Sequence, residues 1–188
     1  HQNNSSAPIY TNIIADIEID AANNYYLVGY FNLNIHIGAI TLNPNGGYQN
    51  RGWVAKFNSA GVAQWAKGIY QECIPTSVDL DNTGNIYIGG YYSGAVDFNP
   101  GSGVSNSTSL GGKDGYLLKL DNTGGFTGNL QKIAGQSDEA VNDIIVNKSS
   151  CDIFIAGTIQ STNVDFNPST GTNALSSTGL NDAFLAKY

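Results

Sequence analysis

The chain repeats one pattern of sequence blocks three times. A glycine within a short apolar and aromatic segment marks each copy, at Gly29, Gly90 and Gly157, so the copies are spaced by 90 − 29 = 61 and 157 − 90 = 67 residues. A block with a lysine in a constant place and a block ending in Asn-Pro recur in the same order around these glycines. Repeats of this length are supersecondary units that bury their apolar faces by stacking on one another. We therefore predict one segment spanning residues 1–188, with repeats at approximately 14–67, 75–132 and 141–188.

Each repeat is predicted to contain short antiparallel strands. Apolar and polar residues alternate at period two in the first block of each copy, as at Ile17 and Ile19, and this alternation is typical of half-buried strands. Polar segments such as Asp81-Asn-Thr-Gly84 suit tight hairpin turns, and no stretch shows a sustained helical period with caps. We predict an all-β fold of β-propeller blades, with four antiparallel strands in each repeat of about 60 residues and an insertion after the second strand. A β-solenoid or stacked β-sandwich is the alternative architecture.

Three blades make an incomplete ring, because propellers close with about four to eight. The third repeat is truncated after its third strand, and Ile9-Tyr10-Thr11 matches Ile69-Tyr70-Gln71, which follows the fourth strand of the first repeat. The chain also contains no methionine. We expect a piece cut from a longer repeat protein, with the remaining blades supplied by the parent chain or by another subunit. A genuinely open fragment is the third possibility.

The composition excludes two kinds of partner. Charged residues make up 12% of the chain, the net charge is −7, and Arg51 is the sole arginine. Nucleic acids and anionic membrane surfaces both require basic patches, and no run approaches the roughly 18 apolar residues of a spanning helix. We therefore expect no nucleic-acid binding and no membrane insertion. The low charge and abundant Asn and Thr favour a secreted or extracellular surface location.

The repeats resemble a known bacterial repeat. The blocks that carry the resemblance are Val78–Tyr91, Val96-Asp-Phe-Asn-Pro100, Asp114–Asp121 and the strand around Trp65-Ala-Lys67. They look like the SBBP-type β-propeller repeats of large secreted or surface proteins from Bacteroidetes-like bacteria. The resemblance extends over most of the chain, from about residue 14 to residue 188. It implies propeller blades that serve as extracellular binding or adhesion scaffolds, and it brings no catalytic motif.

A lysine recurs in one register of an otherwise apolar strand, at Lys56, Lys119 and Lys187. We expect the aliphatic part of each lysine to pack between blades while its ammonium meets a carboxylate. Asp97 and Asp165 are the expected partners, and Thr41 stands in their place in the first repeat, so Lys56 should have a weaker or different partner. The alternative is that the three lysines form a repeated ring of contacts to a ligand.

Tyr91 and Tyr92 are the candidate ligand-binding residues. They follow a strand glycine at an expected strand end, as Tyr30-Phe31 do in the first repeat, whereas the third repeat has Thr158-Ile159 there. Aromatic rings beside Asn and Asp offer the flat apolar face and the hydrogen bonds that sugar recognition needs. Packing between blades is the alternative use of these rings.

No catalytic set can be assembled from the sequence. His1 and His36 are the only histidines, and no pair of carboxylates suggests an acid and a base. Asp79, Asp81 and Asn85 loosely resemble a calcium loop but lack its central Asp-Gly and its closing acidic residue, so we expect a polar hairpin turn. We therefore expect no enzyme activity, no cofactor and no metal.

Cys73 and Cys151 are predicted to be free thiols. In the blade arrangement Cys73 precedes an inner strand, whereas Cys151 lies in the hairpin that follows another inner strand. A strand of about five residues is roughly 17 Å long, so the two cysteines should lie about that far apart along the strand direction. A disulfide needs Cα atoms within about 7 Å of each other.

Two functions from different classes are consistent with these features. The first is a non-catalytic binding or adhesion scaffold, an extracellular β-propeller segment of a larger secreted or cell-surface protein that contacts a protein or a glycan. The second is a carbohydrate-binding, lectin-like module or an accessory domain of a glycan-degrading enzyme. A propeller hydrolase whose catalytic residues lie in other blades is a third hypothesis. Exposure of Tyr91 and Tyr92 beside polar groups would favour the second.

Overall fold

The computed structural model describes residues 11–44 and 49–188, and all regular elements in these ranges are β-strands, which confirms the all-β prediction. The strands are β1 (Asn12–Ile19), β2 (Tyr25–Phe31), β3 (Ile35–Ile37), β4 (Ile40–Leu42), β5 (Arg51–Phe57), β6 (Ala63–Ile69), β7 (Cys73–Leu80), β8 (Ile86–Tyr92), β9 (Ala95–Asp97), β10 (Asn106–Thr108), β11 (Asp114–Leu120), β12 (Phe126–Ile133), β13 (Glu139–Val146), β14 (Ile153–Ile159), β15 (Val164–Asp165), β16 (Ala174–Leu175) and β17 (Asp182–Lys187).

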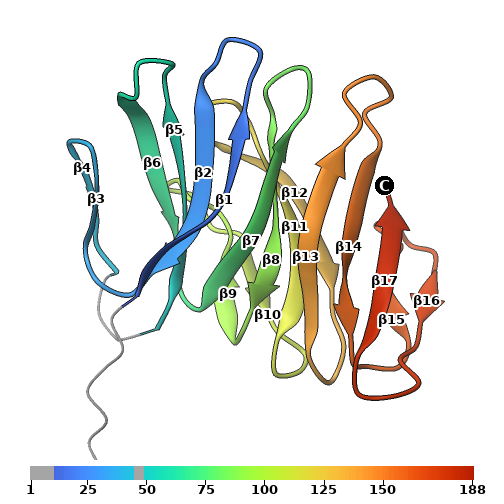
Figure 1. Ribbon diagram of the computed structural model, residues 1–188. Helices are drawn as coiled ribbons and strands as arrows, with labels where there is room; N and C mark the ends of the chain where they lie inside the picture. Colours follow the sequence, from blue (N-terminus) through green and yellow to red (C-terminus); the bar gives the residue numbers. More distant parts are fainter. Residues whose placement is uncertain (1–10, 45–48) are drawn as a thin grey trace, which may run out of the picture.

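Three antiparallel sheets form the body of the molecule. The first has the order β1-β2-β5-β6, the second β7-β8-β11-β12 and the third β13-β14-β17. Each sheet is a meander in which neighbours in the sheet follow one another along the chain, and the sheets stack in chain order (Figure 1). Within the described ranges no strand pairing joins the first sheet to the third, so the stack is open.

A short hairpin follows the second strand of each sheet, where the sequence predicts an insertion. The pairs are β3–β4, β9–β10 and β15–β16. In the second hairpin the Asp97 carboxylate accepts the backbone N–H groups of Asn99 and Ser105 at 3.0 and 2.7 Å. Asp165 accepts equivalent bonds in the third hairpin, from Asn167 and Asn173. The recurring aspartate therefore closes its own loop.

The glycines that mark the repeats are explained by a bulge in the first strand of each sheet. The pairing shifts by one residue between Ile14 and Asp16 in β1, and β7 and β13 shift at the equivalent places. The carbonyl oxygen that precedes each bulge then lies so close to Gly29, Gly90 or Gly157 that a β-carbon there would overlap it. Only glycine allows this approach of two backbones.

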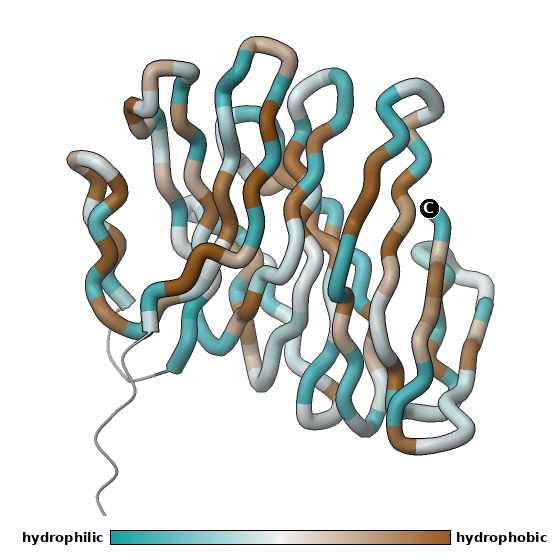
Figure 2. The backbone as a smooth tube through the Cα atoms, in the orientation of Figure 1, coloured by the Kyte–Doolittle hydropathy of each residue, from teal (hydrophilic) through white to brown (hydrophobic). Residues whose placement is uncertain are grey.

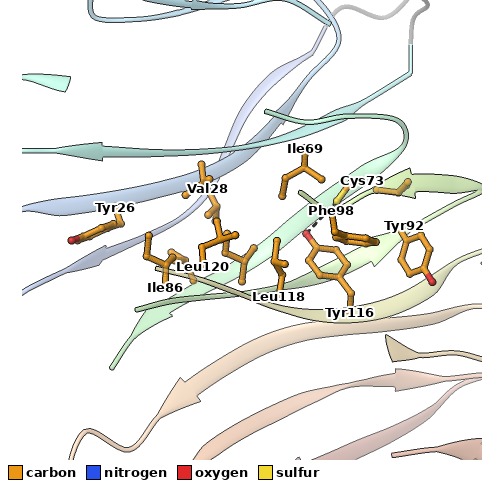
Figure 3. Packing of buried hydrophobic residues seen from close by; sticks show 14 of the residues in the cluster. Tyr26, Val28, Ile69, Cys73, Ile86, Tyr92, Phe98, Tyr116, Leu118 and Leu120 are labelled. Atoms are coloured by element: carbon orange, nitrogen blue, oxygen red, sulfur yellow. Dashed lines mark hydrogen bonds between the residues drawn. The ribbon is translucent and has the colours of Figure 1, made fainter. Parts of the chain in front are cut away.

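Two apolar layers lie between the sheets. We call the face of each sheet that carries Tyr26, Tyr87 or Phe154 its forward face, and the opposite face its rear face. Figure 3 shows the first layer, where Tyr26 and Val28 from the forward face of the first sheet meet Ile86, Leu118 and Leu120 from the rear face of the second. The second layer joins the second and third sheets in the same sense, with Tyr87 and Leu117 against Ile144 and Ile155.

The meanders give the stack two different ends. The hairpin turns, at residues 20–24, 58–62, 81–85, 121–125 and 147–152, gather at one end, which we call the turn end. The links between sheets and the short hairpins β9–β10 and β15–β16 lie at the other, which we call the loop end (Figure 1).

Candidate functional site

A polar cleft lies at the loop end between the second and third sheets. Its volume is about 550 Å³, and it is lined by the link after β12, the segment after β14 and Leu110. A smaller hollow of about 200 Å³ shares Gln160 with it. Together these two hollows form what we call the loop-end cleft. The polar side chains that line it are Tyr91, Lys113, Gln136, Ser137, Asp138, Glu139, Thr158, Gln160, Ser161, Thr162, Asn163 and Asn181.

Glu139, the first residue of β13, is a buried carboxylate in the wall of this cleft. Its side chain is 1% exposed, and Oε1 accepts the backbone N–H groups of Gln160 and Ser161 at 3.2 and 3.0 Å. None of the residues described by the structure hydrogen-bonds to Oε2. A β-carbon on the cleft residue Gly135 would lie 2.8 Å from Oε2, so this oxygen borders the cleft. A buried acceptor without a partner is costly, so Glu139 gives the cleft wall a strained polar group rather than a surface that a ligand can reach.

Asp114, the first residue of β11, is a second buried carboxylate near the cleft. Its Oδ2 accepts the backbone N–H of Leu110 at 2.9 Å, and Asp182 accepts the same bond from Thr178 in the third repeat at 2.6 Å. Burial raises the pKa of Asp114, against the effect of backbone hydrogen bonds from Leu110, Gly135 and Gly111. The recurrence of this bond indicates that Asp114 primarily closes its loop.

The two tyrosines predicted to bind a ligand lie on opposite faces of β8, because successive strand residues alternate. Tyr91 is half-buried in the wall of the loop-end cleft, and Lys113 Nζ lies 5.0 Å from its ring centroid. Burial raises the pKa of Tyr91.

Tyr92 is fully buried between the first two sheets, so the expectation of an exposed ring is wrong for this residue. Its hydroxyl hydrogen-bonds to Ser107 at 3.0 Å, and its ring meets Phe98 edge-on at 5.1 Å between centroids. Burial raises the pKa of Tyr92 to about 12. A residue without exposed surface cannot contact a ligand, so Tyr91 alone of the pair lies at a cleft.

Sequence reasoning missed the polar partners of Tyr91. Gln160 Nε2 donates to Asn181 Oδ1 at 2.8 Å across the cleft wall, and Glu139 lies beside them. One signal was available: Glu139 occupies the position that holds Asn12 and Cys73 in the other repeats, as the strand pairings show. A carboxylate at one copy of an otherwise uncharged position indicates a local role.

The repeated lysines lie at the turn end and their predicted partners were wrong. Lys119 Nζ lies 4.0 Å from Asp81 and 5.0 Å from the ring centroid of Tyr87, its cross-strand neighbour. The other two lysines also lie over aromatic rings: Lys56 over Tyr26 at 4.9 Å and Lys187 over Phe154 at 5.8 Å.

Lys187 in addition pairs with Asp152 at 2.8 Å. Asp97 and Asp165 are not partners of these lysines, because both belong to the short hairpins and both close their own loops. The lysines therefore stabilise the hairpins of their own sheets through charge and ring contacts.

The segment with a loose likeness to a calcium loop is a hairpin turn, as predicted. Asp81 Oδ1 accepts the backbone N–H groups of Thr83 and Asn85, each at 2.9 Å, and Gly84 adopts a φ of 82°. Partial burial opposes its charge, but the hydrogen bonds from Asn85 and Thr83 hold the pKa of Asp81 below its usual value. Asp79 points elsewhere and accepts the N–H of Val146 in the third sheet at 2.6 Å.

Metal ligands do not cluster in the part of the chain that the structure describes: no three His, Cys, Asp or Glu side chains there are placed to hold an ion. His36 lies on an exposed hairpin, where Nδ1 is 3.0 Å from the Thr41 hydroxyl. His1 and the segment Ile9-Tyr10 lie outside the described residues.

Both cysteines are free thiols, as predicted. Cys73 is buried at the start of β7, where its thiol donates to the Tyr116 hydroxyl at 3.4 Å, and burial raises its pKa to about 12. Cys151 is exposed in the turn after β13 with a φ of 61°. The two residues thus lie at opposite ends of the stack.

In the comparison with known proteins, no protein-family model and no curated protein matches the chain. Residues 11–44 and 49–188 contain no helix of the length and apolarity needed to cross a bilayer.

Proposed function

We propose that the chain is a β-propeller segment of the SBBP type, part of a larger secreted or cell-surface protein, and that it acts as a non-catalytic binding or adhesion scaffold. The observation that carries the proposal is the side-by-side position of the first strands of successive sheets. Thr76 in β7 donates its hydroxyl to the Val141 carbonyl in β13 at 2.7 Å, and Ser77 donates to Asp16 in β1 at 3.1 Å. Propeller blades bring their first strands together in this way around a central axis.

A scaffold role is supported by the contrast between the two ends of the stack. At the turn end, Asp or Asn side chains accept the turn N–H groups and lysines cover the adjacent rings. At the loop end, the links between successive sheets, residues 70–72 and 134–138, differ in sequence and length, and the loop-end cleft opens between two sheets. Binding residues are commonly carried by variable loops on a repetitive framework. The binding surface is therefore assigned to the loop end.

A glycan is the second candidate ligand class, favoured by the make-up of the loop-end cleft. Tyr91 supplies a half-exposed ring, Gln160 and Asn181 supply amides, and Asp138 supplies a carboxylate in the lining of the cleft. Sugar rings are bound by an aromatic face together with amide and carboxylate hydrogen bonds to hydroxyls.

A glycan array probed with the purified chain tests this candidate. We expect binding to a restricted set of glycans, with loss of signal in Tyr91→Ala and in Gln160→Ala. Asn82→Ala, at an exposed position of the turn end, is the matched control and should bind like the wild type. A silent array, or variants that bind unchanged, would exclude a glycan at this cleft and leave a protein partner for the scaffold.

Two measurements test the scaffold itself. Antibody staining of intact cells of the source organism, with loss of the signal after external protease treatment, is expected for a surface location. Small-angle X-ray scattering of the chain in monomeric form is expected to show a single curved stack of sheets. Staining that requires permeabilised cells, or scattering from separated sheets, would contradict the location or the blade arrangement respectively.

A further inference from the structure

The third sheet presents a forward face that no other main sheet covers. Val54, Leu117 and Leu185 occupy the same position on the forward faces of the three sheets, as their pairing with Val28, Gly89 and Ala156 shows. Val54 is 0% exposed and Leu117 is 6% exposed, because the next sheet covers them, whereas Leu185 is 71% exposed. Ile145, on the same face, is 60% exposed.

The first sheet presents the opposite, rear face. Ile17, Val78 and Ile144 are equivalent positions of the three first strands. Val78 and Ile144 are each 4% exposed against the preceding sheet, whereas Ile17 is 52% exposed. Apolar residues continue along β1 (Figure 2). The β3–β4 hairpin packs on this rear face against Trp53 and Ala66, and leaves the isoleucines of β1 exposed.

The two uncovered faces have matching hydrogen-bond groups. In the first contact between sheets, Asp16 Oδ2 accepts the Val78 N–H at 2.9 Å, and in the second, Ser77 Oγ accepts the Ile144 N–H at 3.3 Å. The equivalent acceptor on the third sheet is the exposed Asp143, whose Oδ1 accepts the Ser77 hydroxyl at 2.9 Å and leaves Oδ2 for a further donor. The equivalent donor on the first sheet is the N–H of Ile17, which lies 2.8 Å from Asp16 Oδ1. The N–H of Ile144 likewise lies 2.9 Å from Asp143 Oδ1 while it bonds to Ser77. The forward face of the third sheet and the rear face of a first sheet can therefore form the same bond.

The side chains beside this bond also match. Between the second and third sheets, Asp79 lies 3.8 Å from Lys148. At the equivalent places the third sheet has Ile145 and the first sheet has Ala21, so the ion pair is replaced by two apolar residues. Lys148 also pairs with Glu18 of the first sheet at 2.8 Å, so it does not depend on Asp79 alone. Neither Ile145 nor Ala21 carries a charge, and a contact between them therefore leaves no charge without a partner.

From this match we propose that the forward face of the third sheet docks on the rear face of the first sheet in a second copy of this chain. The contact is head-to-tail, and a head-to-tail contact closes only if its rotation completes a ring. Three sheets from each of two copies make six, which lies within the range of about four to eight blades in closed propellers. The inference builds on the blade arrangement proposed above and is independent of any ligand at the loop end.

Sedimentation velocity and light scattering on the 188-residue chain test the proposal. We expect a dimer for the wild type. Leu185→Asp and Ile17→Asp should each give folded monomers, with association weakened on the order of 100-fold or more, because each places a charge in an apolar contact. Val104→Asp, at an exposed apolar loop position away from both faces, is the control and should remain dimeric.

Mixing the two monomeric variants distinguishes a head-to-tail contact from a symmetric one. The Ile17→Asp copy retains an intact third sheet and the Leu185→Asp copy retains an intact first sheet, so a 1:1 mixture should form a heterodimer through one wild-type contact. A wild-type monomer at about 100 µM, a dimer that survives both substitutions, or a mixture that stays monomeric would each overturn the proposal. Circular dichroism confirms folding of each variant, and scattering from Leu185→Asp tests the blade arrangement separately, so failure of one proposal is distinguishable from failure of the other.

Discussion

The carboxylate of Asp16 in the first sheet accepts the backbone N–H of Val78 in the second sheet at 2.9 Å, and the hydroxyl of Ser77 at 3.1 Å. Asp16 belongs to the first repeat, whereas Ser77 and Val78 belong to the second. These bonds therefore fix the position of β1 along β7. The bulge in β7 directly precedes Ser77, so the bonds and the bulge are adjacent.

Replacement of Asp16 should loosen the contact between the first two sheets. Asp16→Ala leaves the N–H of the buried Val78 without its acceptor, and we expect a loss of about 1–3 kcal/mol in the free energy of unfolding, measured with urea. Glu18→Ala on the same strand removes an exposed pair with Lys148, for which about 0–1 kcal/mol is expected. Equal losses in the two variants would contradict a stabilising role for the bond to the Val78 N–H.

Gly90 should tolerate no side chain. A β-carbon there would overlap the carbonyl of Ile74 and lie 3.0 Å from Pro75 Cα, so Gly90→Ala requires the bulge in β7 to move. We expect a loss of about 1–3 kcal/mol in thermal or urea unfolding. Gly179→Ala is the control, since no atom lies within 4 Å of a β-carbon built there. A neutral Gly90→Ala variant would mean that the bulge is not needed for folding.

Much of the local structure could be predicted because it depends on neighbours in sequence. The period-two pattern of β1 and the Asp81 turn follow from spacing within one hairpin. The separation of the cysteines follows from the repeat, which places Cys73 at the start of one first strand and Cys151 beyond the end of another. The partner of Lys119 was wrong because it was sought among residues that recur with the lysine, whereas cross-strand register places it over Tyr87 and near Asp81.

The loop-end cleft could not be predicted for a different reason. It joins Tyr91 to Glu139 and Asn181, residues from two repeats whose relative position depends on how the sheets stack. The burial of Tyr92 depends on the same stacking, because strand alternation shows only that Tyr91 and Tyr92 lie on opposite faces of the strand. Which of them is buried is decided by the first sheet, where Ile69 and Val54 complete the layer around Tyr92.

The two cysteines should differ sharply in reactivity. Thiolate is the reactive form, and burial raises the pKa of Cys73 to about 12 while excluding reagent. Cys151 is exposed in its turn. We expect a colorimetric thiol reagent to modify one thiol in the native protein and both after denaturation, with Cys151→Ser abolishing the native reaction. Rapid modification of both native thiols would contradict the burial of Cys73.

The turn at Asp81 should make stability depend on acid pH. The hydrogen bonds from Asn85 and Thr83 outweigh partial burial and hold the pKa of Asp81 below the usual 3.8. A folded-state pKa below the unfolded value means that the folded state binds the proton less readily. The resulting stabilisation is present in full above about pH 4 and is lost as the pH falls through the folded pKa.

Asp81→Asn isolates this effect because the amide oxygen still accepts the turn N–H groups. We expect the variant to be less stable than the wild type by about 1 kcal/mol near neutral pH, with the difference shrinking toward about pH 3, in urea unfolding at each pH. Asn58 is the natural neutral counterpart, since its Oδ1 accepts the N–H groups of Ala60 and Val62 at 3.1 and 2.9 Å. Asn58→Asp should therefore gain the pH dependence that Asp81→Asn loses, and a difference that stays constant with pH in both variants would rule out the carboxylate charge as its source.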